Sequence, residues 1–257
     1  MKLAILSDIH ANLTALDCVL SDIEKSSVNK IVCLGDVAEL GPQPHEVIER
    51  LRKLGGLMIM GNEDEALLEA RSKGIYRKEA NQKKYDIDRW AFEKMTKEDL
   101  DYIRSFERTF VVQLFQGDRR ILFCHGSPRS NNEQILSSWP SDDVLLKMVS
   151  KFKLPLIVVC GHTHVQMFRK VNDSLIFLNP GSVGMPFKYQ VTVNWSKMTF
   201  EYAPKAEYAL ISLNGKGESS VEFRSFYVDS RLIRESIRKS RMPHAEWLAS
   251  HWRARAV

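Results

Sequence analysis

The sequence predicts an α/β fold, a four-layer α-β-β-α sandwich of two mixed sheets flanked by helices. Near the N-terminus, short apolar runs alternate with apolar residues at helical spacing, which is typical of parallel strands joined by crossover helices. The second half contains many short apolar runs separated by turn residues, which indicates hairpins and a mostly antiparallel arrangement. Two sheets packed face to face, with helices outside, accommodate both patterns.

Three strands are expected at the start of the chain, over 2–8, 29–36 and 56–64. Each is rich in Leu, Ile, Val or Met and ends at polar residues. The intervening segments 13–23 and 47–54 carry apolar residues at helical spacing, and two glycines follow the second of them. Apolar strands with helical crossovers predict a covered, largely parallel sheet in this part of the chain.

Residues 65–106 form a highly charged stretch without a strand-like run. The segment TKED at 96–99 is typical of a helix N-cap, and apolar residues at helical spacing follow it. We interpret the stretch as a helical cap insertion that lies over the functional site. An ordinary pair of packing helices is the alternative, because insertions after a strand end are common whatever their use.

The rest of the chain is rich in predicted strands. A hairpin is expected over 109–126, with its turn at Gly117 and Asp118, and a strand follows at 155–164. A second hairpin is expected over 165–184. Further short strands are predicted at 190–195, 198–203, 208–213 and 221–228.

The composition indicates one compact domain over residues 1–257, since the chain is 44% hydrophobic. No apolar run approaches the ~20 residues that a membrane span requires. Asp8 and His10 interrupt the N-terminal apolar run before a signal-peptide core is complete, so we expect a cytoplasmic protein with no membrane partner. The four cysteines stand singly without a C-x-x-C pair, which predicts buried structural thiols rather than a zinc knuckle.

Basic residues are concentrated in the C-terminal tail, 229–257. From residue 231 onward it holds seven basic and two acidic residues, so the tail accounts for the formal net charge of +5. Apolar residues at helical spacing, broken at Pro243, predict helices. Trp247 and Trp252 lie among the cations, a combination that can bind nucleic acid by stacking and phosphate contact. The favoured interpretation is an amphipathic helix packed on its own domain or on a second subunit of a homo-oligomer.

Side chains able to bind metal follow five of the predicted strands. Because ligand sites form at the carboxyl ends of strands in α/β sheets, we expect these side chains to converge. Each alone has an ordinary explanation as a helix cap or a hydrogen-bonded histidine, but four of the seven histidines follow strands beside Gly or Asp. Mixed His and carboxylate donors suit Mn²⁺, which we favour, Fe²⁺ or Zn²⁺, and seven donors suffice for two ions that share Asp36. The predicted metal ligands are Asp8, His10, Asp36, Asn62, His125, His162 and His164.

The same motifs resemble, in order, those of the calcineurin-like metallophosphoesterase superfamily, whose fold is also an α-β-β-α sandwich. The stretches GDVAELGPQP and NPGSVG further resemble its bacterial and archaeal phosphodiesterase-like branch, and the likeness covers roughly residues 1–184 without the helical insertion. By this resemblance Asp8, His10 and His164 would hold one ion. Asn62, His125 and His162 would hold the other, and Asp36 would bridge the two. The motifs are Asp8-Ile9-His10, Gly35-Asp36, Gly61-Asn62, His125-Gly126 and Gly161-His162-Thr163-His164.

The resemblance implies hydrolysis of a phosphoester by in-line attack of a hydroxide held between the ions. Family members with Gly-Asn-His-Asp/Glu in the third motif use that His at the leaving oxygen, and here Glu63 takes its place. A carboxylate cannot act as a cation. Glu63 is therefore either a catalytic acid whose pKa is raised by burial or by Asp64, or a structural residue near the start of the next helix.

These considerations predict a metal-dependent phosphoric ester hydrolase that acts on a small nucleotide-like substrate with a good leaving group. A phosphodiester or phosphoanhydride fits this description better than an alkyl phosphomonoester. The alternatives are a phosphomonoesterase or protein phosphatase, a dinucleoside polyphosphate hydrolase, and a catalytically weak metal-binding regulatory module. Since all seven predicted ligands are present, a decayed site is disfavoured.

Overall fold

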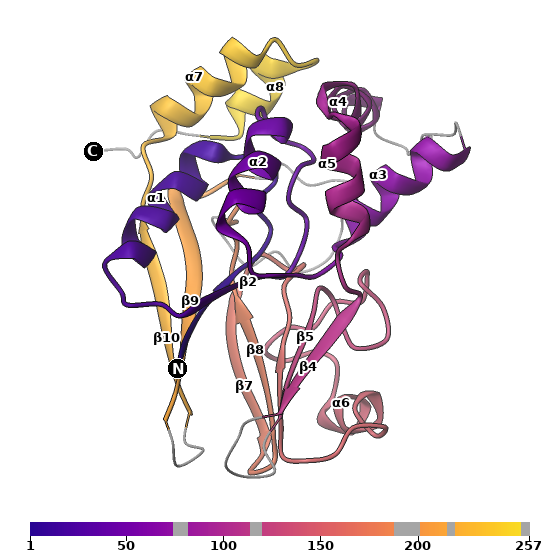
Figure 1. Ribbon diagram of the computed structural model, residues 1–257, viewed down its shortest axis with the longest axis vertical. Coiled ribbons are helices and arrows are strands. Elements are labelled where there is room, and N and C mark those ends of the chain that lie inside the picture. Colours follow the sequence, from indigo (N-terminus) through magenta and orange to yellow (C-terminus); the bar gives the residue numbers. More distant parts are fainter. Residues whose placement is uncertain (74–81, 114–119, 188–200, 215–218, 253–257) are drawn as a thin grey trace.

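The computed structural model describes residues 1–73, 82–113, 120–187, 201–214 and 219–252. Its strands form two five-stranded sheets (Figure 1). The strands are β1 (Lys2–Leu6), β2 (Lys30–Cys33), β3 (Leu57–Met58), β4 (Thr109–Gln113), β5 (Arg120–Cys124), β6 (Leu156–Val159), β7 (Gln166–Asn172), β8 (Leu175–Pro180), β9 (Lys205–Leu213) and β10 (Ser219–Tyr227).

Both sheets are mixed, as the sequence predicts. The first has the order β10-β9-β1-β2-β3, with β1, β2 and β3 parallel and β9 and β10 antiparallel to their neighbours. The second has the order β4-β5-β6-β8-β7, in which β5, β6 and β8 are parallel. Two of the four pairings in this sheet are antiparallel, so the mostly antiparallel second half expected from the sequence is confirmed only when the β9–β10 hairpin is included. Its two hairpins place only the edge strands β4 and β7 antiparallel.

The two sheets pack face to face, and helices cover their outer faces. On β1, Leu3 and Ile5 lie in the core between the sheets, with Phe123 of β5 and Val159 of β6. Leu6 lies in the core under the helices. Each such buried side chain contributes roughly 1.5–3 kcal/mol by leaving water. This alternation fixes the register of β1, because a shift by one residue would exchange its two faces.

Helices from both ends of the chain cover the first sheet, whereas α6 covers the second. The helix predicted from 65 begins earlier, at Asn62, so a predicted metal ligand is its first residue. The predicted N-cap is confirmed: Thr96 and Asp99 form a reciprocal capping box. The helices are α1 (Leu13–Glu24), α2 (Pro44–Leu54), α3 (Asn62–Lys73), α4 (Gln82–Lys94), α5 (Lys97–Arg104), α6 (Asp142–Met148), α7 (Ser230–Ser240) and α8 (Ala245–Ser250).

The C-terminal tail folds back onto the helices of the first sheet. Figure 1 shows α7 and α8 beside α1 and α4. Ile233 and Ile237 are buried, and Trp252 is only 1% exposed. The stacking on nucleic-acid bases considered for Trp252 is therefore wrong, because its ring lies inside the protein. The alternative, an amphipathic helix packed on its own domain, is what the structure shows for α7.

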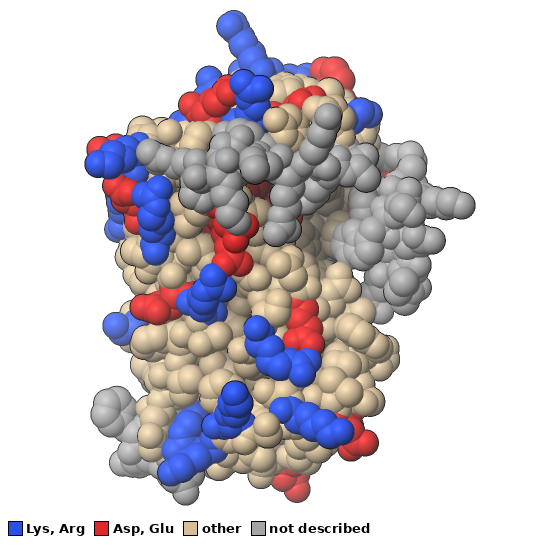
Figure 2. Space-filling view, turned by 90° about the vertical axis from the view of Figure 1, so that its right-hand side faces the viewer, with Lys and Arg blue, Asp and Glu red and all other residues tan. Residues whose placement is uncertain are grey.

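Charges on the face shown in Figure 2 lie in separate small groups, with acidic side chains among the basic ones. Most basic side chains of the tail's described part are also paired: Arg231 with Asp229, Arg238 with Glu246 and Lys239 with Glu235. These pairs lower the net positive charge that the tail presents to an acidic partner.

Other predictions have mixed outcomes. The expected strand at 190–195 and most of that at 198–203 lie outside the described residues, although Tyr202 forms an isolated antiparallel bridge with Phe187. Three of the four cysteines are buried and the fourth is half-buried, and all are free thiols, as predicted. Within the described ranges, no helix has the length and apolar character needed to cross a membrane.

Candidate metal centre

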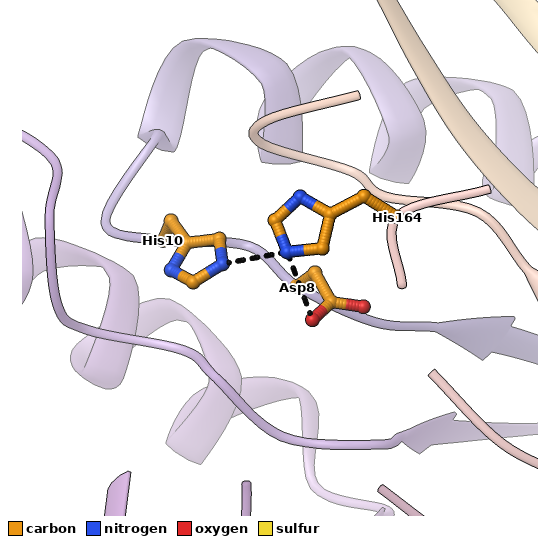
Figure 3. A group of neighbouring side chains, drawn as sticks. All are labelled: Asp8, His10 and His164. Carbon is orange, nitrogen blue, oxygen red and sulfur yellow. Dashed lines mark hydrogen bonds and ion pairs between the residues drawn. The ribbon is translucent and has the colours of Figure 1, made fainter. Parts of the chain in front are cut away.

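The seven predicted ligands come together at the carboxyl ends of the strands, in two neighbouring groups. The first contains Asp8, His10 and His164, which follow β1 and β6 (Figure 3). The second contains one carboxylate and two imidazoles, from Asp36, His125 and His162. Within each group, the three potential ligand atoms lie within 4.8 Å of one another.

In the first group, two imidazole nitrogens face each other. His10 Nε2 lies 3.2 Å from His164 Nε2, and His164 Nε2 lies 3.3 Å from Asp8 Oδ1 (Figure 3). The other nitrogen of His164, Nδ1, lies 2.7 Å from the carbonyl oxygen of Met185. When Nδ1 donates to this carbonyl, the neutral ring directs its Nε2 lone pair at the centre of the group, which is the usual arrangement of a metal-binding histidine.

The second group is arranged on the same principle. His125 Nδ1 lies 2.7 Å from the carbonyl oxygen of Leu34, and Nε2 lies 2.9 Å from Asn62 Oδ1 and 3.3 Å from Asp36 Oδ2. Asn62, the seventh predicted ligand, thus joins this group through its amide oxygen. His125 Nε2 is also 4.0 Å from Asp8 Oδ1, so the two groups are contiguous.

Five of the seven residues have backbones in the left-handed region. This conformation is uncommon for residues other than glycine, and it concentrates at functional sites. Here it turns the side chains inward directly after each strand, while backbone hydrogen bonds such as Asp8 N–H to Gly35 O hold the loops. The five are Asp8, His10, Asp36, His162 and His164, with φ between 46° and 67°.

Gly61 and Gly35 permit the close approach of the loops after β2 and β3. A Cβ on Gly61 would lie 2.1 Å from Asp36 Oδ1, and one on Gly35, whose φ is +102°, would lie 2.3 Å from the Gly61 nitrogen. Side chains at these strand ends would crowd the site, which glycine avoids. The structure shows that they would first displace Asp36 itself.

Two supporting residues were missed by the sequence analysis. The Asp64 carboxylate is fully buried and accepts hydrogen bonds from the backbone N–H groups of Asp36, Val37 and Gly61. It therefore fixes the Asp36 loop against the start of α3. Asn179 does the same for the His162–His164 loop, since its amide nitrogen donates to Gly161 O and to Thr163 Oγ1. The sequence signal was present, because Asp64 and Asn179 lie inside the quoted motifs, but their partners are distant in sequence.

Glu63 lies beside the second group, in the first turn of α3. Its Oε1 accepts a hydrogen bond of 3.2 Å from Asn62 Nδ2, and its Oε2 accepts one of 2.7 Å from Lys84 Nζ. Burial raises the pKa of Glu63 to about 7, although Lys84 acts in the opposite direction. Nearby carboxylates, Asp36 and Asp88, add to the rise, whereas the contribution expected of Asp64 is not among its main causes. Asp64 instead accepts a hydrogen bond from the backbone N–H of Gly61, directly before the start of α3.

The same pattern of pKa shifts occurs in both groups of candidate ligands. Burial would raise the pKa of Asp8, but His164 and His125 outweigh it and hold the pKa at about 2. Burial, with the charge of a neighbouring histidine, lowers the pKa of His10 and that of His162 to about 4. Burial also disfavours a charge on His125, but Asp36 outweighs it and raises the pKa to about 10; Asp8 likewise raises the pKa of His164. In each group, burial thus favours one neutral imidazole, a carboxylate favours the protonated form of the other, and a bound cation would compete with that proton.

The donor set fits divalent cations. Within the described part of the chain, Asp8 Oδ1 is buried and has no hydrogen-bond partner beyond the 3.3 Å contact with His164 Nε2. Unsatisfied buried polar atoms are costly and call for an explanation, and a metal ion supplies one. Carboxylate oxygens, imidazole nitrogens and one amide oxygen suit Mn²⁺, Fe²⁺ or Zn²⁺.

A family model, the calcineurin-like phosphoesterase superfamily domain, matches residues 1–199. The chain belongs to this superfamily. The resemblance seen in the motifs is thereby confirmed, and the fold agrees with it. Members of the superfamily bind divalent metals, and membership supports a hydrolase.

Relatives of the same length are known. An uncharacterised protein of Methanocaldococcus jannaschii is 26% identical over 264 residues, which cover 96% of this chain and 95% of that protein. The crystal structure of a metallophosphoesterase from Sphaerobacter thermophilus is 25% identical, covers 98% of both chains and has a TM-score of 0.69. A hypothetical protein from Pyrococcus horikoshii has the same fold, with a TM-score of 0.77, 20% identity and coverage of 97% of this chain and 96% of that chain.

Proposed function

We propose that the protein is a dinuclear metal-dependent phosphoesterase that cleaves a phosphodiester or phosphoanhydride bond in a small nucleotide-like substrate. The observation that carries the proposal is the pair of contiguous groups, each with a carboxylate and two imidazoles at the same end of the two sheets. Asp8, His10 and His164 would hold one divalent ion. Asn62, His125 and His162 would hold the second, and Asp36 would serve both.

When bound, two such ions lower the pKa of a water molecule toward neutrality and offset the charge of the phosphoryl oxygens. The chain's own residues prepare the centre for that task. Asp8 and Asp36 supply buried negative charge, which favours cations over water. The carbonyl groups of Leu34 and Met185 orient His125 and His164, so that the Nε2 atom of each ring faces other candidate ligand atoms.

Glu63 is better placed to position Asn62 than to protonate a leaving group. Because Asn62 Nδ2 donates to Glu63 Oε1, the amide oxygen of Asn62 is turned toward His125. The second carboxylate oxygen of Glu63 is engaged by Lys84. The raised pKa meets one requirement of an acid, so the two roles are separated by substitution: Glu63→Gln keeps an acceptor for Asn62 but cannot release a proton.

The substrate class follows from this arrangement. If Glu63 does not protonate the leaving oxygen, catalysis is efficient only for leaving groups that depart with little assistance, such as nucleoside phosphates or activated alcohols. A diester with an activated leaving group or a phosphoanhydride meets this condition, whereas an alkyl phosphomonoester does not.

The test is hydrolysis of bis-p-nitrophenyl phosphate beside p-nitrophenyl phosphate, with chelator-treated protein to which Mn²⁺ is returned. We expect metal-dependent cleavage that favours the diester. Asp36→Asn should reduce it by at least about 100-fold, since loss of even a supporting contact to a metal ligand costs about 10–100-fold. Asp17→Asn is the matched control, because Asp17 lies outside both ligand groups and forms a partly exposed ion pair with Arg50.

Glu63→Gln should retain most of the diesterase activity if Glu63 positions Asn62. A loss that grows with the pKa of the leaving group would instead identify Glu63 as the acid. Tight binding of Mn²⁺ through Asp36 without turnover of either ester would contradict the hydrolase and favour a metal-binding regulatory module.

A further inference from the structure

Four aromatic rings form a continuous column from the metal centre to the C-terminal tail. The imidazole of His164 is stacked on the ring of Phe187, with centroids 4.9 Å apart and an interplanar angle of 14°. Phe187 is stacked in turn on Tyr202 at 6.0 Å and 19°, and Tyr202 packs against Trp252 at 5.0 Å. We call His164, Phe187, Tyr202 and Trp252 the ring column. It joins a candidate metal ligand to Trp252, the second residue after the end of α8.

Backbone hydrogen bonds fix the spacing of the column. Phe187 and Tyr202 are paired as an antiparallel bridge, and Ala203 N–H donates to Pro186 O at 2.8 Å. Tyr202 N–H donates to the carbonyl oxygen of His251 at 3.0 Å. The rings therefore cannot separate without breaking main-chain contacts between segments that are distant in sequence.

The far end of the column is anchored. Trp252 is 1% exposed and belongs to the hydrophobic core under the helices. Helix α8 is also tied to α4, because His244 Nε2 lies 2.7 Å from Asp86 Oδ2 and the Lys83 ammonium lies 5.1 Å from the Trp247 ring centroid. Figure 1 shows α8 in this position between α7 and α4. A rigid anchor at one end allows the column to restrain the His164 ring at the other.

We propose that the C-terminal tail is a positioning element of the metal centre: α8 and Trp252, acting through Tyr202 and Phe187, hold the imidazole of His164 in its ligating orientation. This rests on the proposed function, in which His164 is a metal ligand. His164 Nδ1 has a single carbonyl partner, and the stack on Phe187 restricts rotation of the ring about that contact. Supporting contacts to metal-binding histidines typically contribute about 10–100-fold to metal affinity.

The test is calorimetric titration of Mn²⁺ into the chelator-treated full-length chain. Phe187→Leu, which keeps apolar volume but removes the ring, should weaken one of the two binding steps by about 10-fold or more. Phe187→Tyr, which restores a ring, should recover it. Phe226→Leu is the matched control, because Phe226 is a partly buried aromatic residue on β10 whose ring packs against Tyr208, outside the column.

A second pair of variants tests the tail itself. Trp252→Leu should weaken the same step as Phe187→Leu, and Trp252→Phe should not. The proton resonances of the His164 ring give an independent signature, since loss of the stacked ring shifts them in the metal-free protein. If Trp252→Leu does not fold, Phe187→Leu still tests the stack of Phe187 on His164. Tyr202→Leu then replaces Trp252→Leu as the test of the link to α8.

Two outcomes would overturn the proposal. One is an unchanged pair of binding steps in Phe187→Leu, and the other is an equal weakening in Phe226→Leu. Failure of the unsubstituted chain to bind Mn²⁺ would instead remove the metal centre and this proposal together, so the two failures are distinguishable.

Discussion

Replacement of Lys84 by methionine should destabilise the protein more than loss of any exposed ion pair. Lys84 Nζ lies 2.7 Å from both Glu63 Oε2 and Asp88 Oδ2, and the three side chains are only 18–22% exposed. Burial disfavours the charge on Lys84, but the two carboxylates outweigh this and raise its pKa. Lys84→Met keeps the length of the side chain and leaves two largely buried carboxylates without their shared cation.

The magnitude follows from the burial. Loss of one partner of a fully buried pair costs about 3–5 kcal/mol, because an uncompensated charge remains. Here the residual exposure reduces that cost, and Glu63, whose pKa is already about 7, can take up a proton at neutral pH. We expect a loss of about 2–3 kcal/mol of unfolding free energy, or roughly 4–12 °C in Tm for a chain of this size.

The assay is thermal and urea unfolding of the metal-free, full-length chain. Lys239→Met is the matched control, since Lys239 forms the same 2.7 Å contact with Glu235 but the two side chains are 74% and 56% exposed. That change should leave the unfolding free energy nearly unchanged. Glu63→Gln combined with Lys84→Met should lose less stability than the sum of the single variants, because only the Asp88 carboxylate then lacks the lysine. Equal costs for Lys84→Met and Lys239→Met would refute this reasoning.

Two further outcomes are expected. Gly61→Ala should abolish tight Mn²⁺ binding, because a Cβ would lie 2.1 Å from Asp36 Oδ1. Gly55→Ala, with φ +65° and nothing within 4 Å of its Cβ, should cost only about 1–2 kcal/mol of stability and leave metal binding intact. Calorimetry measures both the Mn²⁺ affinity and the stability. The hydrogen bond to Asp99 raises the pKa of His45, so its contribution to stability is complete below about pH 6.5 and is lost as the pH rises through the raised value. The stability difference between the unsubstituted chain and His45→Gln, measured by urea unfolding, should accordingly shrink from pH 5.5 to pH 9. A constant difference would contradict a contribution from the protonated His45.

The candidate ligands could be found from sequence because the signal is local. A polar residue directly after an apolar run is visible without knowledge of the fold, and parallel strands bring such ends together. Asp8 and His10 follow β1 in this way, and His162 and His164 follow β6. The fold class was accessible for the same reason, since the periodicity of strands and helices is also local.

The residues that organise the centre could not be found in this way, because their partners are remote. Asp64 is 27 and 28 residues from two of the N–H groups that it accepts from. Lys84 is 21 residues from Glu63 and belongs to another helix. The parallel pairing of β6 with β8 was missed because β7 intervenes in sequence but lies at the sheet edge. Each of these contacts depends on tertiary packing, which the composition of the chain does not reveal.

Trp252 shows how a local pattern can mislead. An aromatic residue among cations is compatible with a nucleic-acid surface and equally with an amphipathic helix whose aromatic side chain faces inward. The position of Tyr202, 50 residues earlier in the chain, distinguishes these two interpretations. Its ring packs against Trp252, and its backbone N–H donates to the carbonyl oxygen of His251.

Helix α4 connects to both groups of candidate ligands by separate routes. One route runs from Lys84 through Glu63 to Asn62 and the second group. The other runs from Asp86 through His244 to α8, and from there along the ring column to His164 and the first group. Each ligand group takes side chains from both sheets, and α4 contacts an outer support of each group. A displacement of α4 would therefore loosen both groups together, whereas a change in either route alone would affect one. Helix α4 thus contacts both the Glu63 side chain and the residue before α8.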